Sequence, residues 1–238
     1  MKIKKLISAL VLGSMLVGLS GCNITDFSAE NLHRPPKAVG DEAEIEQLIA
    51  KTADSGYTLK YPKNGKFRSA IIMTDLDGND SNEAVAFFRN SAETSSVHML
   101  VMYSKDNSWE IASDNIFETT DIDSVDFADL TGNGKAEIIV NSTTYTPNVG
   151  KLSCYSYSEG KTNEVGSGQS CSSFVTGDFD NDGTSEIMSL VLYTTENEAL
   201  ASMLDYNEDS KSLYAKAMAN MDPNVVKYKN IAVTKLDN

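Results

Sequence analysis

The sequence is poor in basic residues and in histidine. Its 238 residues include 20 lysines and arginines against 34 aspartates and glutamates, and the formal net charge is -14. This excess of negative charge makes nucleic acid and a bare anionic membrane poor partners, and it favours cations and basic surfaces. Neither His33 nor His98 belongs to a group that combines a nucleophile, a general base and an orienting residue. We therefore predict no catalytic site.

Cysteines and long apolar runs are also scarce. Beyond Cys22, the chain has Cys154 and Cys171, which would be free to form a disulfide in an exported protein but suit a buried apolar core equally well. The apolar run at residues 6–19 is too short to span a bilayer comfortably. The overall hydrophobic content of 41% is still enough for a packed globular core.

The first 22 residues are organised like an export signal. A basic MKIKK start precedes the apolar run, which ends in Leu-Ser-Gly-Cys at residues 19–22. This ending resembles the lipobox of bacterial lipoproteins, which implies lipidation of Cys22, removal of the preceding peptide and an extracytoplasmic protein anchored to the cell membrane by lipid. A plain secretory peptide or an uncleaved anchor is the alternative. Removal of the signal would leave 17 basic and 34 acidic residues, a net charge of -17.

A tether is predicted at residues 23–40, where Pro35 and Pro36 stiffen the chain into an extended form. The main domain is expected to follow a short helix and to occupy residues 57–238.

The short helix is predicted at residues 41–56. Asp41 and Glu44 form a start that resembles a capping box, and Gly56 is typical of a helix end. One apolar stripe follows helical spacing and consists of Ile45, Leu48, Ile49 and Thr52. We expect this stripe to dock on the main domain; binding of a partner is the alternative.

From residue 57 onward, the pattern changes to short β-rich runs between loops. One acidic loop occurs three times, starting at Asp75, Asp129 and Asp178, with spacings of 54 and 49 residues. Each loop lies between the first and second of four strand-like runs, and four antiparallel strands are the content of one β-propeller blade. The predicted strands are 68–74, 83–88, 96–103 and 108–113; 124–128, 137–145, 151–157 and 162–166; and 172–177, 186–193, 199–206 and 212–218.

We therefore predict an all-β fold of three four-stranded antiparallel propeller blades and the start of a fourth. The expected blades are residues 67–117, 122–168 and 171–220, with a partial blade at 227–238. The partial blade is predicted because residues 229–238 repeat the approach to the first acidic loop. Propellers close with about four to eight blades. The chain is accordingly expected to be the N-terminal part of a longer product or of a truncated gene, or else to associate or remain an open, weakly stable arc.

The acidic loops carry oxygen groups at alternate positions. In the third loop, Asp178, Asp180 and Asp182 stand at positions 1, 3 and 5, and a glycine and a glutamate stand at positions 6 and 9. With a carbonyl at position 7, these oxygens would wrap a hard cation such as calcium. Three aspartates with no base next to them in the sequence would otherwise repel one another. An EF-hand is excluded, because position 12 lacks the required glutamate and the flanking segments are strands.

The motif D-x-D-x-D-G-x-x-D/E followed by an apolar strand resembles the FG-GAP or VCBS-type repeats of integrin α-subunit propellers and secreted bacterial proteins. The resemblance covers residues 67–238 and implies a calcium-bearing hairpin in each propeller blade. The ligands that it implies are Asp178, Asp180, Asp182, the Thr184 carbonyl and Glu186 in the third loop; Asp75, Asp77, Asn79, the Ser81 carbonyl and Glu83 in the first; and Asp129, Asn133, the Lys135 carbonyl and Glu137 in the second.

Two of the loops depart from this motif. In the first loop, Asp80 replaces the turn glycine, but aspartate tolerates a left-handed backbone better than most residues do. In the second loop, Thr131 replaces an acid and Lys135 adds a positive charge. A metal-free hairpin in which Asp and Asn side chains bond local amides is the alternative for every loop, and it is favoured for the second.

Three classes of function fit these features. The leading interpretation is a calcium-stabilised binding or adhesion module outside the cytoplasmic membrane, without catalysis, whose ligand is a protein or a glycan and not a nucleic acid. An enzyme acting on polysaccharide and a structural or assembly subunit are the alternatives. Likeness of fold alone does not choose between them.

Overall fold

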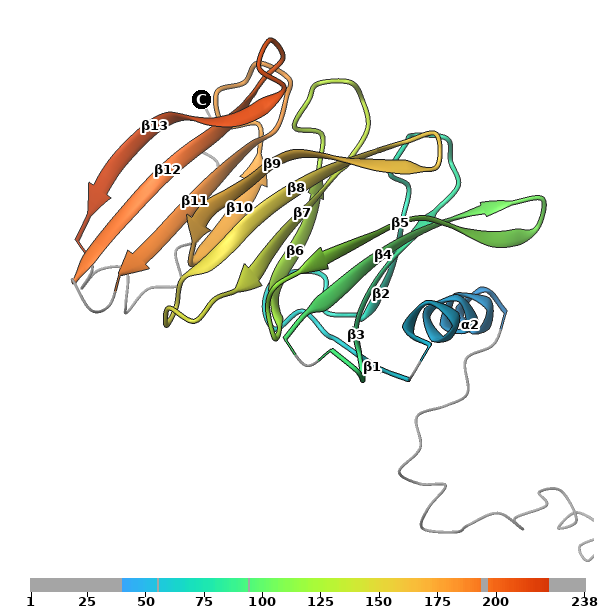
Figure 1. Cartoon of the computed structure of the whole chain (residues 1–238). Helices are drawn as coiled ribbons and strands as arrows, with labels where there is room; N and C mark the ends of the chain where they lie inside the picture. Colours follow the sequence, from blue (N-terminus) through green and yellow to red (C-terminus); the bar gives the residue numbers. More distant parts are fainter. Residues whose placement is uncertain (1–39, 55, 94, 194–196, 223–238) are drawn as a thin grey trace, which may run out of the picture. The chain divides into compact units, whose positions relative to one another are not determined.

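The computed structural model describes residues 40–222, apart from residues 55, 94 and 194–196. The predicted signal peptide with Cys22, the tether up to residue 39 and the partial unit at 227–238 lie outside the described residues. The described part is mostly β, with one short helix and three antiparallel sheets of four to five strands (Figure 1).

Each sheet contains four strands that follow one another in the chain. The first comprises β2 (Ile71–Thr74), β3 (Glu83–Asn90), β4 (Val97–Lys105) and β5 (Ser108–Phe117); the second β6 (Ile122–Ala128), β7 (Glu137–Thr143), β8 (Gly150–Ser158) and β9 (Lys161–Cys171); and the third β10 (Ser173–Gly177), β11 (Glu186–Tyr193), β12 (Glu198–Asn207) and β13 (Ser212–Met221). Each of the twelve strands predicted from the sequence overlaps one of these strands. The prediction of repeated four-stranded antiparallel units is confirmed.

The first sheet has one strand that was not predicted. β1 (Tyr57–Leu59) pairs with the end of β3, where Tyr57 is opposite Asn90, while β2 pairs with the start of the same strand. Three residues are too few for an alternating pattern to be recognised in the sequence. Only the pairing with β3 makes this segment a strand.

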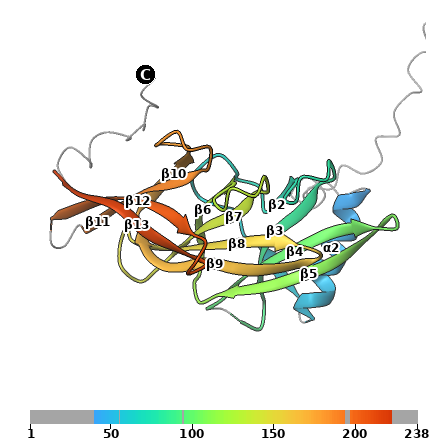
Figure 2. The same cartoon turned by 90° about the horizontal axis from the view of Figure 1, so that it is seen from above.

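The core consists of three apolar layers, because side chains alternate between the two faces of each strand. In β3, Val85 and Phe87 face the second sheet, whereas Ala86 and Phe88 face the helix. A further cluster joins the second and third sheets and includes Ile139, Cys154 and Leu204. The first and second sheets are therefore buried on both faces, and Figure 2 shows the three sheets in sequence order.

The helix α2 (Asp41–Ala53) covers the free face of the first sheet. Its fully buried side chains are Ile45, Ile49 and Ala53, which pack with Leu100 and Trp109. The predicted docking of the apolar stripe on the main domain is thus confirmed.

The helix begins at Asp41 as predicted, but the predicted capping box and the predicted C-terminal end are wrong. Gly40 precedes the helix and no side chain caps it, so Asp41 lies inside the first turn, where its negative charge favours the helix N-terminus. The helix ends at Ala53, before Gly56, because Asp54 adopts a positive φ of 53°. The left-handed residue that ends the helix is therefore Asp54, and not the glycine at residue 56.

Both described cysteines are free and buried. Cys154 and Cys171 lie in the apolar cluster between the second and third sheets. Burial raises the pKa of the Cys171 thiol to about 12 and raises that of Cys154 as well. Of the two roles left open by the sequence, the structure shows small apolar core residues.

His98 and Trp109 are part of the first sheet and its core. His98 is buried on β4, stacks on Phe88 with ring centroids 4.8 Å apart, and its Nδ1 atom lies 2.9 Å from the carboxylate of Asp114. Trp109 packs in the cluster beneath the helix.

Candidate metal centre

The three acidic loops lie at equivalent ends of the three sheets. They connect β2 to β3, β6 to β7, and β10 to β11. In each hairpin, the glutamate at loop position 9 pairs with the residue just before position 1: Glu83 with Thr74, Glu137 with Ala128, and Glu186 with Gly177. The same register is thus repeated three times.

Neighbouring loops are hydrogen-bonded to each other through their backbones. The Ala136 amide donates to the Leu76 carbonyl over 3.1 Å, and the Ser185 amide donates to the Asp129 carbonyl over 2.8 Å. Both donors stand at position 8 of their loops. The second loop also approaches the third closely, since a Cβ atom on Gly132 would lie 2.6 Å from the Thr184 methyl group. The loops form one continuous row.

The aspartate at position 1 organises each loop through backbone amides. Asp75, Asp129 and Asp178 each accept hydrogen bonds from the amides at positions 5 and 6, with distances between 2.8 and 3.2 Å. The side chain at position 5 then accepts a bond from the amide at position 7 in every loop. These contacts are the local Asx-type bonds that the metal-free alternative predicts, and they are present in all three loops.

The backbone conformation of the loops also repeats. Positions 4 and 6 have positive φ in every loop, and the residues concerned are Gly78 and Asp80, Gly132 and Gly134, and Asn181 and Gly183. Asp80, with φ of 64°, adopts the left-handed conformation that its position requires. Position 4 was not predicted to be left-handed; the glycines and asparagine there were the available signal.

The glutamate at position 9 is buried and closes each loop. One carboxylate oxygen of Glu83, Glu137 and Glu186 accepts the amide of the apolar residue at position 2, over 2.8, 2.8 and 2.7 Å respectively. Burial raises the pKa of all three glutamates. Each loop thus holds a desolvated carboxylate whose other oxygen needs a partner of its own.

In the third loop, that second oxygen has no partner. Glu186 is 0% exposed, and its Oε1 atom is buried without a hydrogen bond. Carboxylate oxygens of Asp178, Asp180, Asp182 and Glu186 all lie within 4.8 Å of one another. Burial raises the pKa of Glu186, and the negative charges of Asp180 and Asp182 raise it further. This arrangement of acids could hold a metal ion.

The first loop contains a smaller cluster of the same kind. Carboxylate oxygens of Asp75, Asp77 and Glu83 lie within 4.8 Å of one another, and the Oδ1 atom of Asp77 is buried without a hydrogen bond. The predicted ligand Asn79 uses its side-chain oxygen to accept the amide of Ser81 over 2.7 Å. The first loop therefore also combines clustered acids with an unpartnered oxygen.

The second loop satisfies its glutamate internally. The Thr131 hydroxyl donates to Oε1 of Glu137 over 3.1 Å, and the Thr131 amide donates to Oε2 over 3.2 Å. The side chain of Asn133 accepts a hydrogen bond from the backbone amide of Lys135, so these two predicted ligands stabilise the turn. At loop position 3, the second loop has the hydroxyl of Thr131 where the other two loops have an aspartate. This geometry fits the metal-free hairpin that the sequence favoured for this loop.

One basic residue near the third loop was missed. The Lys216 ammonium of β13 contacts Asp180 and lies 2.9 Å from Asp205. These two acids hold the pKa of Lys216 above its ordinary value. No base lies next to these aspartates in the sequence, but the sheet brings Lys216 to Asp180 from 36 residues away, so the repulsion among the acids is partly relieved. Lys216 engages one oxygen of Asp180 and leaves the Oε1 atom of Glu186 without a hydrogen bond.

Comparison with known proteins finds no family model that matches the chain and no matching curated protein. Within the described ranges, no helix has both the length and the apolar character needed to cross a bilayer.

Proposed function

We propose that the protein is a calcium-stabilised binding module of the β-propeller type, without catalytic activity, held at the outer side of the cell membrane by lipid on Cys22. The proposal of propeller blades is supported by three successive four-stranded antiparallel sheets whose first hairpins carry equivalent loops. The proposal of lipid anchoring rests on the Leu-Ser-Gly-Cys sequence at residues 19–22.

The observation that carries the metal proposal is the unpartnered Oε1 atom of Glu186 inside a cluster of four carboxylates. A buried carboxylate oxygen without a donor costs several kcal/mol in principle, and a bound cation would remove that cost together with the repulsion among the acids. The candidate ligands are all oxygens, which suits calcium better than zinc or copper. Calcium also tolerates the irregular geometry of a loop better than magnesium does.

Calcium titration tests this proposal. The purified protein, first dialysed against EDTA, should unfold at a higher temperature in millimolar calcium. At a free concentration one hundred times the dissociation constant, linkage adds about 2.7 kcal/mol, which corresponds to a rise of roughly 5–10 °C for a domain of this size. Isothermal titration should count two ions, one for each cluster.

The matched variants are Glu186→Gln and Glu198→Gln. Glu186→Gln keeps an acceptor for the Phe179 amide but removes the charge that calcium needs, so it should reduce the stoichiometry to one. Glu198 is an exposed carboxylate on β12 of the same sheet, and its variant should behave as wild type. A melting temperature that does not respond to calcium would leave the loops as metal-free hairpins.

An assembly subunit is a second candidate, favoured by the outer face of the third sheet. Val175, Met188, Leu190, Ala201 and Met221 line an apolar recess of about 260 Å³ on this sheet. The corresponding face of the first sheet is covered by α2, so head-to-tail stacking is blocked and two copies would meet through their third sheets. Light scattering across a concentration series should then show a dimer that Leu190→Lys dissociates. A monomer at all concentrations excludes this second function.

A further inference from the structure

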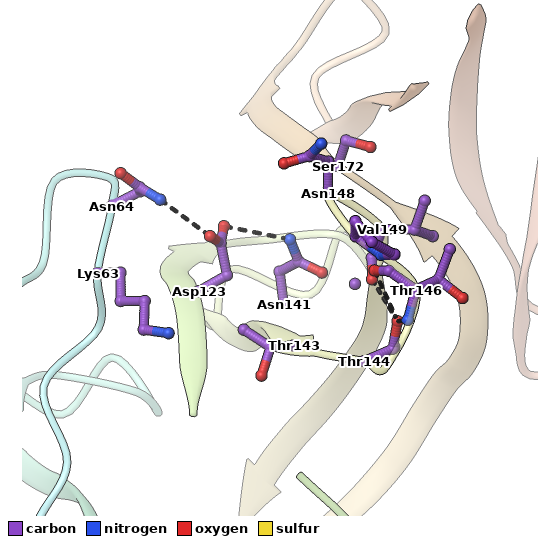
Figure 3. Close-up of a pocket in the computed structure, with 12 residues that line it drawn as sticks. Lys63, Asn64, Asp123, Asn141, Thr143, Thr144, Thr146, Asn148, Val149 and Ser172 are labelled. Carbon is purple, nitrogen blue, oxygen red and sulfur yellow. Dashed lines mark hydrogen bonds between the residues drawn. The ribbon is translucent and has the colours of Figure 1, made fainter. Parts of the chain in front are cut away.

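A second polar site lies at the opposite ends of the strands from the acidic loops. It is a recess of about 360 Å³, shown in Figure 3. Its walls come from the segment before β2, the start of β6, the end of β7 and the loop at residues 144–149.

The Asp123 carboxylate is fixed in place by neutral donors. It accepts the side-chain amide of Asn64 over 2.9 Å and that of Asn141 over 3.3 Å, and Figure 3 shows both contacts. The Ser124 hydroxyl adds a third bond over 3.0 Å. The carboxylate is therefore oriented before any ligand arrives. Lys63, which also lines the recess, forms an ion pair with Asp121 at 3.1 Å.

Asn141 is a positioning residue for this carboxylate. Its side chain is almost fully buried, and a Cβ atom on residue 150 would lie 2.3 Å from its Oδ1 atom. Gly150 therefore leaves the space in which the Asn141 amide lies. Tight packing on one side and the bond to Asp123 on the other therefore hold the Asn141 amide in place.

The remaining wall presents hydroxyl and amide groups from the end of β7, from the closed turn that follows it and from the residue between β9 and β10. Thr143, Thr146, Asn148 and Ser172 line it. The turn is closed by the Thr144 hydroxyl, which donates to the Val149 carbonyl over 2.5 Å, and by the Val149 amide, which donates to the Thr146 carbonyl over 3.2 Å. Hydroxyl and amide side chains can donate and accept hydrogen bonds. The hydroxyls of Thr143 and Thr144 already donate to the Asp121 and Val149 carbonyls, so they would act as acceptors toward a ligand.

Tyr145 stands on the same turn with its ring 95% exposed. Its chain neighbours, Thr144 and Thr146, both line the recess. An exposed aromatic ring on a loop offers a flat apolar surface and one polar tip, and such residues are enriched where ligands are bound. Tyr145 is not itself among the lining residues, so its ring stands in solvent on the turn beside the recess and has no structural role in the core.

We propose that this recess binds a neutral saccharide, with Asp123 and the threonine hydroxyls bonding to its hydroxyl groups and Tyr145 stacking on a face of the sugar ring. A saccharide presents hydroxyls that donate and accept at its edges and C–H groups on its faces, which matches this combination of groups. The net charge of -14 and the carboxylate of Asp123 disfavour acidic ligands. A peptide would need a deeper apolar anchor pocket than this polar recess provides. The inference rests on the proposed role as a binding module and names its ligand class.

The test uses an array of neutral and acidic oligosaccharides, followed by ligand-observed NMR with the neutral hexoses and N-acetylhexosamines that bind. The full chain should bind neutral saccharides. Tyr145→Ala should weaken binding about tenfold, with an unchanged melting temperature because the ring packs on nothing. Asp123→Asn should weaken binding as well. Tyr214→Ala, which removes a half-exposed tyrosine on β13, is the matched control and should bind as wild type.

Three results would overturn the inference: no saccharide bound on the array, equal binding by Tyr145→Ala and wild type, or binding of a peptide library with no response to sugars. Calcium titration of the same preparation separates this inference from the metal proposal. Stabilisation by calcium without sugar binding rejects only the recess, and sugar binding without a calcium response rejects only the metal.

Discussion

The hydrogen bond between Thr131 and Glu137 offers a direct test of why the second loop differs from its neighbours. Glu137 is 1% exposed, and its Oε1 atom accepts the Thr131 hydroxyl over 3.1 Å. Thr131→Val keeps the shape of the side chain and removes only this donor. A buried acceptor left without a partner costs about 1–3 kcal/mol. For a domain of this size, the melting temperature should fall by roughly 2–12 °C.

Thr131→Asp should convert the loop into a third candidate metal site. In EDTA, the new carboxylate would face Asp129 and Glu137 without a donor, so the variant should be destabilised at least as much as Thr131→Val. In calcium, it should recover most of that loss, and titration should count three ions instead of two. Thr131→Val should not recover, because it adds no ligand.

Thermal unfolding of both variants, with and without calcium, is the measurement. Thr58→Val, at an exposed strand threonine, is the control and should change stability by less than about 0.5 kcal/mol. The reasoning is refuted if Thr131→Val is as stable as wild type, since the hydroxyl would then not be needed by Glu137. It is equally refuted if Thr131→Asp is indifferent to calcium while the native protein responds.

Three further predictions concern the contacts between elements. Gly132→Ala should lower the free energy of unfolding by about 1–3 kcal/mol, because φ at this residue is 69° and the new methyl group would lie 2.6 Å from that of Thr184. Thr184→Ser should restore part of this loss in a double-mutant cycle, and an additive result would contradict the prediction. Ile49→Ala should cost about 2–4 kcal/mol in denaturant unfolding, since Ile49 is a fully buried residue of α2 that packs on the first sheet; a change below about 0.5 kcal/mol would mean that the helix does not dock. Asp121→Asn should cost about 1 kcal/mol at neutral pH. Burial acts to raise the pKa of Asp121, but hydrogen bonds from Lys60 and Lys63 outweigh it and hold the pKa below 3.8. This contribution is present above pH 3.8 and is lost as the pH falls through the folded pKa, so wild type and variant should converge in acid; a constant difference would contradict it.

The strands were predictable because their signals are local. Alternating or continuous apolar runs such as residues 83–88 and 186–193 are bounded by loops rich in glycine, asparagine and aspartate, and each coincides with an observed strand. The short strand β1 and the true C-terminal end of α2 were not predictable. β1 exists because β3 offers it a free edge, and the helix end depends on a single positive φ at Asp54.

The candidate metal centre was predictable only in part. Spacing alone singled out Asp178, Asp180, Asp182 and Glu186, whose carboxylates the fold does bring together. It could not show that Lys216 contacts Asp180, since these residues are distant in sequence and meet only through the sheet. The recess at Asp123 was missed for the same reason, because its walls come from four separate segments.

The sequence by itself determined the repeated four-stranded units and the positions of the acidic hairpins, since both depend on residues close together in the chain. Tertiary structure decided which buried carboxylate oxygens have a donor, which acid meets a lysine, and which face of each sheet is covered. Those outcomes depend on contacts between strands and between sheets, where a few ångströms determine whether a charged group has a partner.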